Sequence, residues 1–225
     1  MSVVGVDGCG RGWVAVVLDG ARAAGAHFLP NIAALGHVVP DAEVIAIDMP
    51  IGLLDSGFRL ADTAARQVLG VRRSSVFATP VRAAVEAASY DEANAISKTI
   101  NGVGISRQSF ALCPKILEVD GWLVHAPCDV REVHPEVAFA ELLGRPASSS
   151  KKTWQGMIER RDALAAAGIT LEAVDPHVGR LVGTDDMLDA AAVAWTARRI
   201  LHGAARSLPD PPEVDPFGRE IAIWV

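Results

Sequence analysis

Hydrophobic residues in the first part of the chain occur in short β-branched runs that predict strands. Two such runs, at residues 3–7 and 13–19, flank the glycine-rich turn GCGRG, and a weaker run follows at residues 21–29. Runs of this length, separated by turn signals, are typical of an antiparallel meander. The sequence therefore predicts three consecutive strands at the N-terminus.

One short helix and one buried strand are expected next. Asn31 can cap a helix over residues 31–39, because its side chain can accept a hydrogen bond from a free backbone N–H. The run AEVIAID at residues 42–48 is almost wholly apolar, which favours a position inside a parallel sheet. Asp7 and Asp48 are therefore expected at the ends of two buried strands.

Helical patterns dominate the rest of the chain. The segment at about residues 56–119 is richer in Gly, Ser and Arg, and it predicts an inserted helical subdomain. Strand character returns at residues 128–136 and at residues 219–225. Further helices are predicted at residues 135–144, 151–168 and 184–201. We therefore predict an α/β fold that forms a single domain over residues 1–225.

The composition restricts the class of protein. Of the 225 residues 50% are hydrophobic, so the chain can bury a sizeable core and is not a disordered tail. The three cysteines are far apart and form no Cys-x-x-Cys pair, which argues against a disulfide framework or a structural zinc site. No secretory signal is recognisable, and no apolar run approaches the ~20 residues of a spanning helix. A cytoplasmic, soluble protein without a membrane partner is expected.

The charge is distributed unevenly along the chain. The formal net charge is −6, whereas residues 56–115 are net basic. A basic segment on an acidic, metal-binding body would suit a substrate that carries phosphate groups. Chance clustering on a solvated helical surface would give the same pattern. The acidic chain argues against broad binding to duplex nucleic acid, because phosphate contacts supply most non-specific affinity.

Acidic residues occur where predicted strands end or a predicted helix begins. Asp7 and Asp48 end two strands, and Glu132 lies near the end of a third. The last long helix, with Thr184 as its expected cap, carries three acids in its first turns: Asp185, Asp186 and Asp189. Their i, i+3 and i, i+4 spacing puts two of the three on one helix face.

These acids predict a metal site if their strands are neighbours. The carboxylates of Asp7 and Asp48 would then meet at one edge of the sheet and repel each other. Two hard divalent cations, Mg²⁺ or Mn²⁺, would offset the repulsion because they prefer carboxylate oxygens. A pair of such cations can activate a water and stabilise the leaving oxygen of a phosphodiester. Each acid alone could be a turn former or a helix cap, so the prediction depends on their combination.

Seven sequence blocks, in order along nearly the whole chain, resemble those of a known family. The blocks are VVGVDGCGRGWVAVVLD (3–19), VIAIDMPIGL (44–53), RRSSVFATPVRA (72–83), GISRQSFALCPKILEVD (104–120), REVHPEVAF (131–139), SKKTWQGMIERRDAL (150–164) and TDDMLDAAAVAW (184–195). The chain resembles the family termed domain of unknown function 429, whose members are predicted to be RNase H-like nucleases. The resemblance implies an RNase H-like mixed five-stranded sheet with flanking helices. An antiparallel hairpin would lead into parallel strands, and a late helix would cross the sheet.

The resemblance also implies a function. In related nucleases of the Holliday-junction-resolvase type, acids from the first strand, a central strand and the final helix bind the metals. The chain would then be a divalent-metal-dependent nuclease that hydrolyses phosphodiester bonds of nucleic acid. The implied catalytic residues are Asp7, Asp48, Glu132, Asp186 and Asp189, and all of these with Asp185 are the implied ligands of two Mg²⁺ or Mn²⁺ ions. From their charge and spacing, rather than from the resemblance, we predict as substrate-binding residues Arg72, Arg73, Arg82, Arg107, Gln108, Lys115, Lys151 and Lys152.

Other functions remain open at this point. An actin-like or sugar-kinase-like protein would use the same opening hairpin to hold phosphate or ATP, and a non-enzymatic binding module would use the acids as caps and turns. A Rossmann site is excluded, because a strand rather than a helix follows GCGRG. His134 is more often structural than a ligand when no partner lies at ligand spacing. The Ala-rich last helix is compatible with a homodimer, and the substrate could be DNA, RNA or a small nucleotide.

Overall fold

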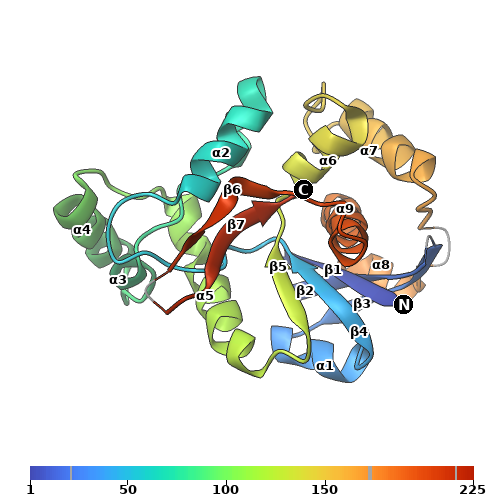
Figure 1. Ribbon diagram of the computed structural model, residues 1–225, viewed down its shortest axis with the longest axis horizontal. Helices are drawn as coiled ribbons and strands as arrows, with labels where there is room; N and C mark the ends of the chain where they lie inside the picture. The colour runs from blue at the N-terminus through green and yellow to red at the C-terminus, as the bar shows by residue number, and fades with distance from the viewer. Residues whose placement is uncertain (21, 172–173, 216) are drawn as a thin grey trace.

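A mixed five-stranded sheet forms the centre of the computed structural model, which describes residues 1–20, 22–171, 174–215 and 217–225. The strand order is β3-β2-β1-β4-β5 (Figure 1). The strands are β1 (Ser2–Cys9), β2 (Gly12–Asp19), β3 (Arg22–Leu29), β4 (Ala42–Ile47) and β5 (Asp129–Glu132). β1, β2 and β3 are antiparallel neighbours, whereas β4 runs parallel to both β1 and β5. The predicted meander followed by parallel strands is confirmed, except at Ala21, which lies outside the described residues.

Helices flank this sheet, and a second, two-stranded sheet follows them. The α-helices are α1 (Leu35–Val38), α2 (Leu60–Leu69), α3 (Arg82–Val85), α4 (Tyr90–Asn101), α5 (Arg107–Trp122), α6 (Pro135–Leu143), α7 (Trp154–Ala166), α8 (Pro176–Leu181) and α9 (Thr184–Leu201). Short 3-10 segments are η1 (Ile32–Ala34), η2 (Gly70–Ser75) and η3 (Leu123–His125). β6 (Ser207–Val214) and β7 (Glu220–Trp224) pair antiparallel. Within the described ranges, no helix has the length and apolar character needed to cross a membrane.

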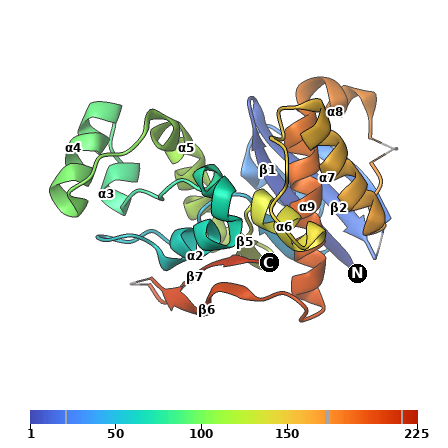
Figure 2. The ribbon, with the colours of Figure 1, turned by 90° about the horizontal axis from the view of Figure 1, so that it is seen from above.

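Different helices cover the two faces of the five-stranded sheet. Val3 of β1 packs with α9 in one hydrophobic core, and Figure 2 shows α9 crossing the sheet on this side. Val4 points to the opposite face, which η1, α1 and α5 cover. Successive residues of a strand alternate between faces, so Val3, Gly5 and Asp7 all face α9.

The helices of residues 56–119 do not form one separate unit. α2 packs on α6 and the β6-β7 sheet through residues such as Ala65. α5 covers the five-stranded sheet through Ile116. Among the described residues, α3 and α4 share a small core around Ala84 and Ala93, joined by the start of α5. The predicted inserted subdomain is therefore divided between the body of the molecule and a lobe that contains α3 and α4 (Figure 1).

Two predicted helix caps have different outcomes. Asn31 Oδ1 accepts a hydrogen bond from the Ala34 N–H at 3.1 Å, as predicted, although the helix is divided into η1 and α1. Thr184 is not the cap of α9, because Gly183 occupies the N-cap position and Thr184 is the first helical residue. The Asp186 carboxylate accepts a hydrogen bond from the Gly183 backbone instead, as the third residue of a capping box does. The Thr184 prediction was wrong because the acid two residues further on satisfies the free backbone group.

Helix α9 lies against the backbone of β1 at Gly5. A Cβ atom at Gly5 would overlap the Ala190 carbonyl oxygen and the Ala194 backbone nitrogen. Glycine in a strand permits this kind of close approach, because it has no side chain to separate the two backbones. The first turns of α9, which carry Asp186 and Asp189, are thereby brought over the end of β1.

We expect the substitution Gly5→Ala to destabilise the fold. The added methyl group must push α9 away from β1, and overpacking of this kind costs about 1–3 kcal/mol or more. Urea denaturation followed by circular dichroism measures the loss. Gly121→Ala in α5 is the matched control, because a Cβ there would meet nothing within 4 Å. The control should be neutral or stabilising by roughly 0.5–1 kcal/mol, and equal stability of the two variants would argue against the close approach.

Candidate functional site

The register of the parallel strands puts two carboxylates next to each other. Val6 of β1 is in register with Ile47 of β4, so the next positions are Asp7 and Asp48. The Asp48 N–H continues the ladder by donating to the Val6 carbonyl at 2.9 Å. Because the two acids occupy equivalent positions on neighbouring strands, both face α9. The structure thus brings the two strand-end acids together.

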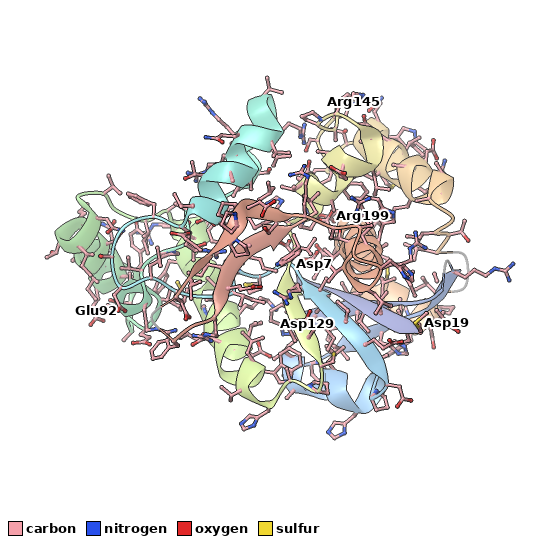
Figure 3. The ribbon with its side chains drawn as sticks, viewed as in Figure 1. Asp7, Asp19, Glu92, Asp129, Arg145 and Arg199 are labelled. Atoms are coloured by element: carbon pink, nitrogen blue, oxygen red, sulfur yellow. The ribbon has the colours of Figure 1, made fainter. Side chains whose placement is uncertain are left out.

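Helix α9 adds two further carboxylates at this edge of the sheet. Asp186 and Asp189 lie three residues apart in its first turns, so they share a helix face. Their charges act on the Asp7 carboxyl together with that of Asp48. Figure 3 shows Asp7 beside α9 near the centre of the molecule. We term Asp7, Asp48, Asp186 and Asp189 the acid cluster, which three distant segments of the chain supply.

Burial and mutual repulsion raise the pKa values of the acid cluster. The Asp7 residue is only 6% exposed, and burial raises its pKa well above the usual value, with further increases from Asp48 and Asp189. Burial also raises the pKa of Asp48, and it raises that of Asp189 to about 7. Burial, followed by the charge of Asp185, raises the pKa of Asp186. Four acids at one buried place therefore favour the binding of a positive charge.

Two consecutive lysines between α6 and α7 provide positive charge. Lys151 forms an ion pair with Asp189, and Lys152 forms one with Asp185. Burial alone would lower the pKa of Lys151, but the carboxylates of Asp189, Asp7 and Asp48 outweigh burial and raise it. Burial acts to raise the pKa of Asp185, but its hydrogen bond from Lys152 outweighs this effect and lowers it. Lys151 is thus the internal counter-ion of the acid cluster.

The donor chemistry of the acid cluster fits a hard divalent cation, although Lys151 supplies the positive charge here. In the part of the chain that the structure describes, no three His, Cys, Asp or Glu side chains are already spaced to hold a metal ion. Asp189 Oδ2 contacts Lys151, whereas Asp189 Oδ1 is buried without a hydrogen-bond partner. A free, buried carboxylate oxygen among repelling acids is the kind of ligand that Mg²⁺ and Mn²⁺ prefer.

Glu132, predicted as a further ligand, is not brought to the acid cluster. It is in register with Ile47, one residue before Asp48, so it faces the opposite side of the sheet. There it pairs with the buried Arg59 guanidinium at 2.5 Å and accepts the Ile51 N–H at 2.7 Å. Burial raises the pKa of Glu132 to about 7, against the opposing effect of Arg59. Glu132 therefore anchors the segment that follows β4.

The cationic residue Lys115 of α5 lies beside the opening hairpin. A Cβ at Gly8 would lie 3.2 Å from the Lys115 Cδ, and the Lys115 Nζ donates to the Gly12 carbonyl at 2.5 Å. Burial lowers the pKa of Lys115, while nearby acids that include Asp7 and Asp186 act against this shift. Lys115 therefore contributes positive charge close to the acid cluster, from the other face of the sheet.

The remaining residues predicted to bind substrate lie in different parts of the structure. Arg73 and Gln108 line one cavity, and the Arg72 Nε lies 3.4 Å from the Glu136 Oε2. Two residues of the set make contacts in the helical lobe. Arg82 Nη1 lies 2.9 Å from the Asp120 Oδ2, and Arg107 stacks on Tyr90 at 4.3 Å from the ring centroid. The structure does not bring Arg82 and Arg107 to the acid cluster.

Sequence reasoning missed how strongly residues at the start of α6 act on the acid cluster. Burial raises the pKa of Asp48 while His134 acts to lower it, and the His134 Nδ1 is buried without a hydrogen-bond partner. Glu136 pairs with the fully buried Arg160 at 2.5 Å and also acts on Asp48 and Asp189. The only sequence signal was the block REVHPE, in which a strand ends directly before a proline-initiated helix.

The fold and the acid cluster define a mixed α/β protein with a buried carboxylate site on one face of its sheet. The family model described as protein of unknown function, DUF429, matches residues 5–214, and the chain therefore belongs to this family. Comparisons with curated proteins and with solved structures found no match. The matched region contains the whole acid cluster together with Lys115 and Lys151.

We expect Arg59→Met to destabilise the protein by about 3–5 kcal/mol, because it leaves the buried Glu132 carboxylate without its counter-charge. Loss of Arg59 raises the folded-state pKa of Glu132 further above its unfolded value. Glu132 in the folded variant then keeps its proton at pH values at which the unfolded chain has already lost it. The free energy of unfolding therefore falls as the pH rises toward that folded-state pKa. Urea denaturation at about pH 5.5 and pH 8 should therefore show a larger loss at the higher pH.

The double variant that carries Arg59→Met and Glu132→Met is the control for this pair. It removes both charges, so much of the stability and of the pH independence should return. A single Arg59→Met variant as stable as the parent protein at pH 8 would contradict the role of the pair.

Proposed function

We propose that this chain is a divalent-metal-dependent nuclease with an RNase H-like fold, which hydrolyses phosphodiester bonds of nucleic acid. The observation that carries the proposal is the meeting of four carboxylates, of which those of Asp7 and Asp189 are buried, from β1, the end of β4 and the start of α9. Burying like charges together opposes folding, and strongly perturbed pKa values cluster at functional sites. A purely structural role for all four acids therefore explains the arrangement poorly.

The sheet topology supports the RNase H-like part of the proposal. The antiparallel strands β1 to β3 lead into the parallel strands β4 and β5, and α9 crosses the sheet over β1 (Figure 2). The family resemblance implies this arrangement. It also implies that the acids come from the first strand, a central strand and the last helix, and these elements carry the acid cluster.

The acid cluster would hold the cations in this proposal, through carboxylate oxygens of Asp7, Asp48, Asp186 and Asp189. Mg²⁺ or Mn²⁺, when bound, would supply Lewis-acid activation of a water and stabilisation of the leaving oxygen. The Asp186 carboxylate accepts a hydrogen bond from the Gly183 backbone at the cap of α9, which fixes its orientation. Asp189 presents its free Oδ1 to the same space.

Lys151 has two roles in the proposal. Its ammonium neutralises Asp189 in the absence of another cation, as the ion pair indicates. With a divalent cation bound at the acid cluster, the Lys151 ammonium would be free to contact the negatively charged phosphate, where a positioned cation stabilises developing charge. Lys152 adds a second positive charge on the same loop.

We expect Asp7→Asn to abolish Mn²⁺-dependent cleavage of a labelled oligonucleotide and to leave the fold intact. Removal of one of four repelling carboxylates should also raise the melting temperature of the metal-free protein in EDTA, because it relieves buried like-charge repulsion. A cleavage assay, a thermal melt and calorimetric titration with Mn²⁺ measure the three effects.

The matched control is Asp41→Asn, which changes an exposed carboxylate just before the other end of β4. It should cleave and bind Mn²⁺ like the parent protein. Cleavage retained by Asp7→Asn would refute the proposal. ATP hydrolysis without cleavage of nucleic acid would favour an actin-like protein instead, and the absence of saturable Mn²⁺ binding would favour a non-enzymatic module.

We expect Lys151→Met to increase the affinity of the protein for Mn²⁺. The substitution removes the ammonium that competes for Asp189, and an advantage of about 1.4 kcal/mol corresponds to a tenfold lower Kd. In EDTA the variant should melt at a lower temperature, because the acid cluster loses its counter-ion, and added Mn²⁺ should restore stability. Lys152→Met, which removes the exposed ion-pair partner of Asp185, should change the Mn²⁺ affinity and the melting temperature less. Equal or weaker Mn²⁺ binding by Lys151→Met would contradict the competition.

A further inference from the structure

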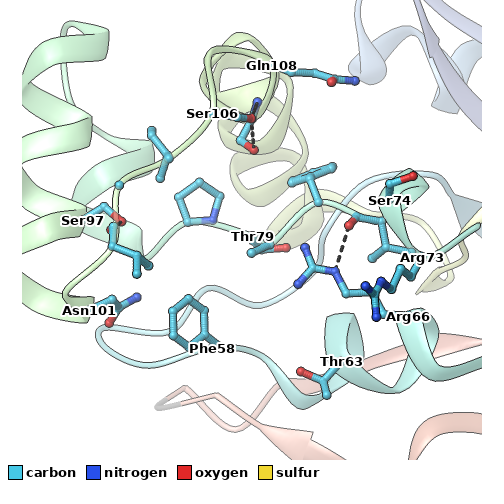
Figure 4. A pocket seen from close by; sticks show the side chains of 18 of the residues that line it. Phe58, Thr63, Arg66, Arg73, Ser74, Thr79, Ser97, Asn101, Ser106 and Gln108 are labelled. Atoms are coloured by element: carbon cyan, nitrogen blue, oxygen red, sulfur yellow. Dashed lines mark hydrogen bonds between the residues drawn. The ribbon is translucent and has the colours of Figure 1, made fainter. Parts of the chain in front are cut away.

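A large cavity lies beside the acid cluster, between α2 with η2 on one side and α4 with α5 on the other. Its volume is about 1290 Å³, and Figure 4 shows side chains from both sides that point into it. Arg66 of α2 and Arg73 of η2 belong to one wall, and Asn101 of α4 and Gln108 of α5 belong to the opposite wall. We term this space the arginine cavity.

The arginine cavity is positively charged in an acidic protein. The chain has a formal net charge of −6, yet none of the described residues that line the cavity is acidic. The Arg66 Nε donates to the Val76 carbonyl at 3.0 Å, which orients the guanidinium into the cavity (Figure 4). Arg66 and Arg73 are absent from the ion pairs formed within the described ranges. Two guanidinium groups are therefore free to bind an anion, and the planar fork of arginine matches phosphate.

The cavity also offers aromatic and polar surface. Phe58 is 50% exposed although it is a large apolar residue, and Phe77 lines the cavity together with it. An exposed aromatic ring beside arginines suits a ligand that combines a flat aromatic group with a negative charge, since nucleobases stack on such rings. The side chains of Thr79 and Gln108 add hydrogen-bonding groups to the lining.

Shared residues connect the arginine cavity to the acid cluster. Phe77 and Thr79 line the cavity and also a small depression that contains Asp48 and His134. Thr79 is fixed by its N–H, which donates to Asp62 Oδ2 at 2.8 Å. The arginine cavity and the depression at Asp48 therefore share a wall, so the cavity lies next to the proposed cleavage site.

The size and shape of the cavity restrict its occupant. A volume of about 1290 Å³ exceeds the roughly 300–1,000 Å³ of a small-molecule pocket, so more than one nucleotide fits. A B-form duplex, whose major groove alone is about 12 Å wide, needs far more room than a cavity of this volume offers. Nucleotides can thus enter only as a single strand or as bases that have left a duplex.

We propose that the arginine cavity is a binding subsite for unpaired nucleotides of a single-stranded segment, with Arg66 and Arg73 on phosphates and Phe58 on a base. This inference rests on the proposed nuclease function, because it names the substrate that the acid cluster receives. Single-stranded nucleic acid is therefore the occupant that we propose. A free mononucleotide would have no further strand to extend from the cavity to Asp48.

The test measures binding without cleavage. Fluorescence anisotropy with a labelled oligothymidylate of about eight nucleotides, within the site sizes of single-strand-binding grooves, is recorded in EDTA. A blunt hairpin duplex and thymidine monophosphate are the competing probes. The single strand should bind at least about tenfold more tightly than either, which is a difference of ~1.4 kcal/mol.

Three variants test whether residues that line the cavity contribute to binding of the single strand. Arg66→Gln and Arg73→Gln should each weaken binding of the single strand about tenfold and lower the salt dependence by about one phosphate contact. Phe58→Ala should weaken it about fivefold or more, because a stacking contact is lost. Arg22→Gln, which removes the same charge from an exposed position on the edge strand β3, is the matched control and should bind like the parent protein.

The outcomes separate this inference from the proposed function. Equal binding of single strand and duplex, preferential binding of the mononucleotide, no binding at all, or equal behaviour of Arg66→Gln and Arg22→Gln would each overturn the inference. If Mn²⁺-dependent cleavage occurs while Arg66→Gln binds the single strand as tightly as the parent protein, the cavity assignment fails and the nuclease proposal stands. If binding depends on Arg66 and Arg73 but no metal supports cleavage, the nuclease proposal fails and the subsite stands.

Discussion

The backbone contact between α9 and β1 at Gly5 is the constraint on which the site depends. A helix that touches a strand this closely cannot slide along it without a clash, because Gly5 has no side chain whereas its neighbours on the same face of β1, Val3 and Asp7, do. Asp189 therefore stays over Asp7 and Asp48, although three like charges at one buried place oppose folding. The contact fixes the geometry of the acid cluster, and the apolar packing of α9 across the sheet supplies the stability that this geometry requires.

The carboxylates on the two faces of the sheet are neutralised in different ways. On the α9 face the acid cluster has a lysine counter-ion on a loop, and one Asp189 oxygen is left without a partner. On the other face, Glu132 has a fully buried arginine and a backbone N–H, so its carboxylate is enclosed by protein. A partly exposed counter-ion and a carboxylate oxygen without a partner suit exchange with a ligand, whereas an enclosed pair suits a fixed structural role. This contrast separates the candidate chemistry from the scaffold.

Sequence reasoning succeeded where the physics is local and periodic. The meeting of Asp7 and Asp48 is expected if their strands are neighbours, because parallel strands end at one sheet edge. Helix spacing predicts that two of the three acids of α9 share a face, and the family resemblance implies that these are Asp186 and Asp189. Glu132 was grouped with them because the sequence does not reveal the one-residue offset between the ends of β4 and β5, and that offset reverses the face. The pairing of Lys151 with Asp189 depends on a loop conformation, and the division of the helical segment depends on tertiary packing, so neither is encoded in a local pattern.

Helix α5 connects parts of the molecule that lie far apart in the chain. Its first turn borders the arginine cavity, Lys115 lies over Gly8 beside the acids, and Glu118 accepts hydrogen bonds from the Trp13 indole and the Ile32 N–H at 3.1 Å and 2.6 Å. One helix, with Pro114 in its interior, thus contacts both the cavity and the opening hairpin. In the proposed function, a strand bound in the arginine cavity would therefore rest on the same helix that supports the hairpin bearing Asp7.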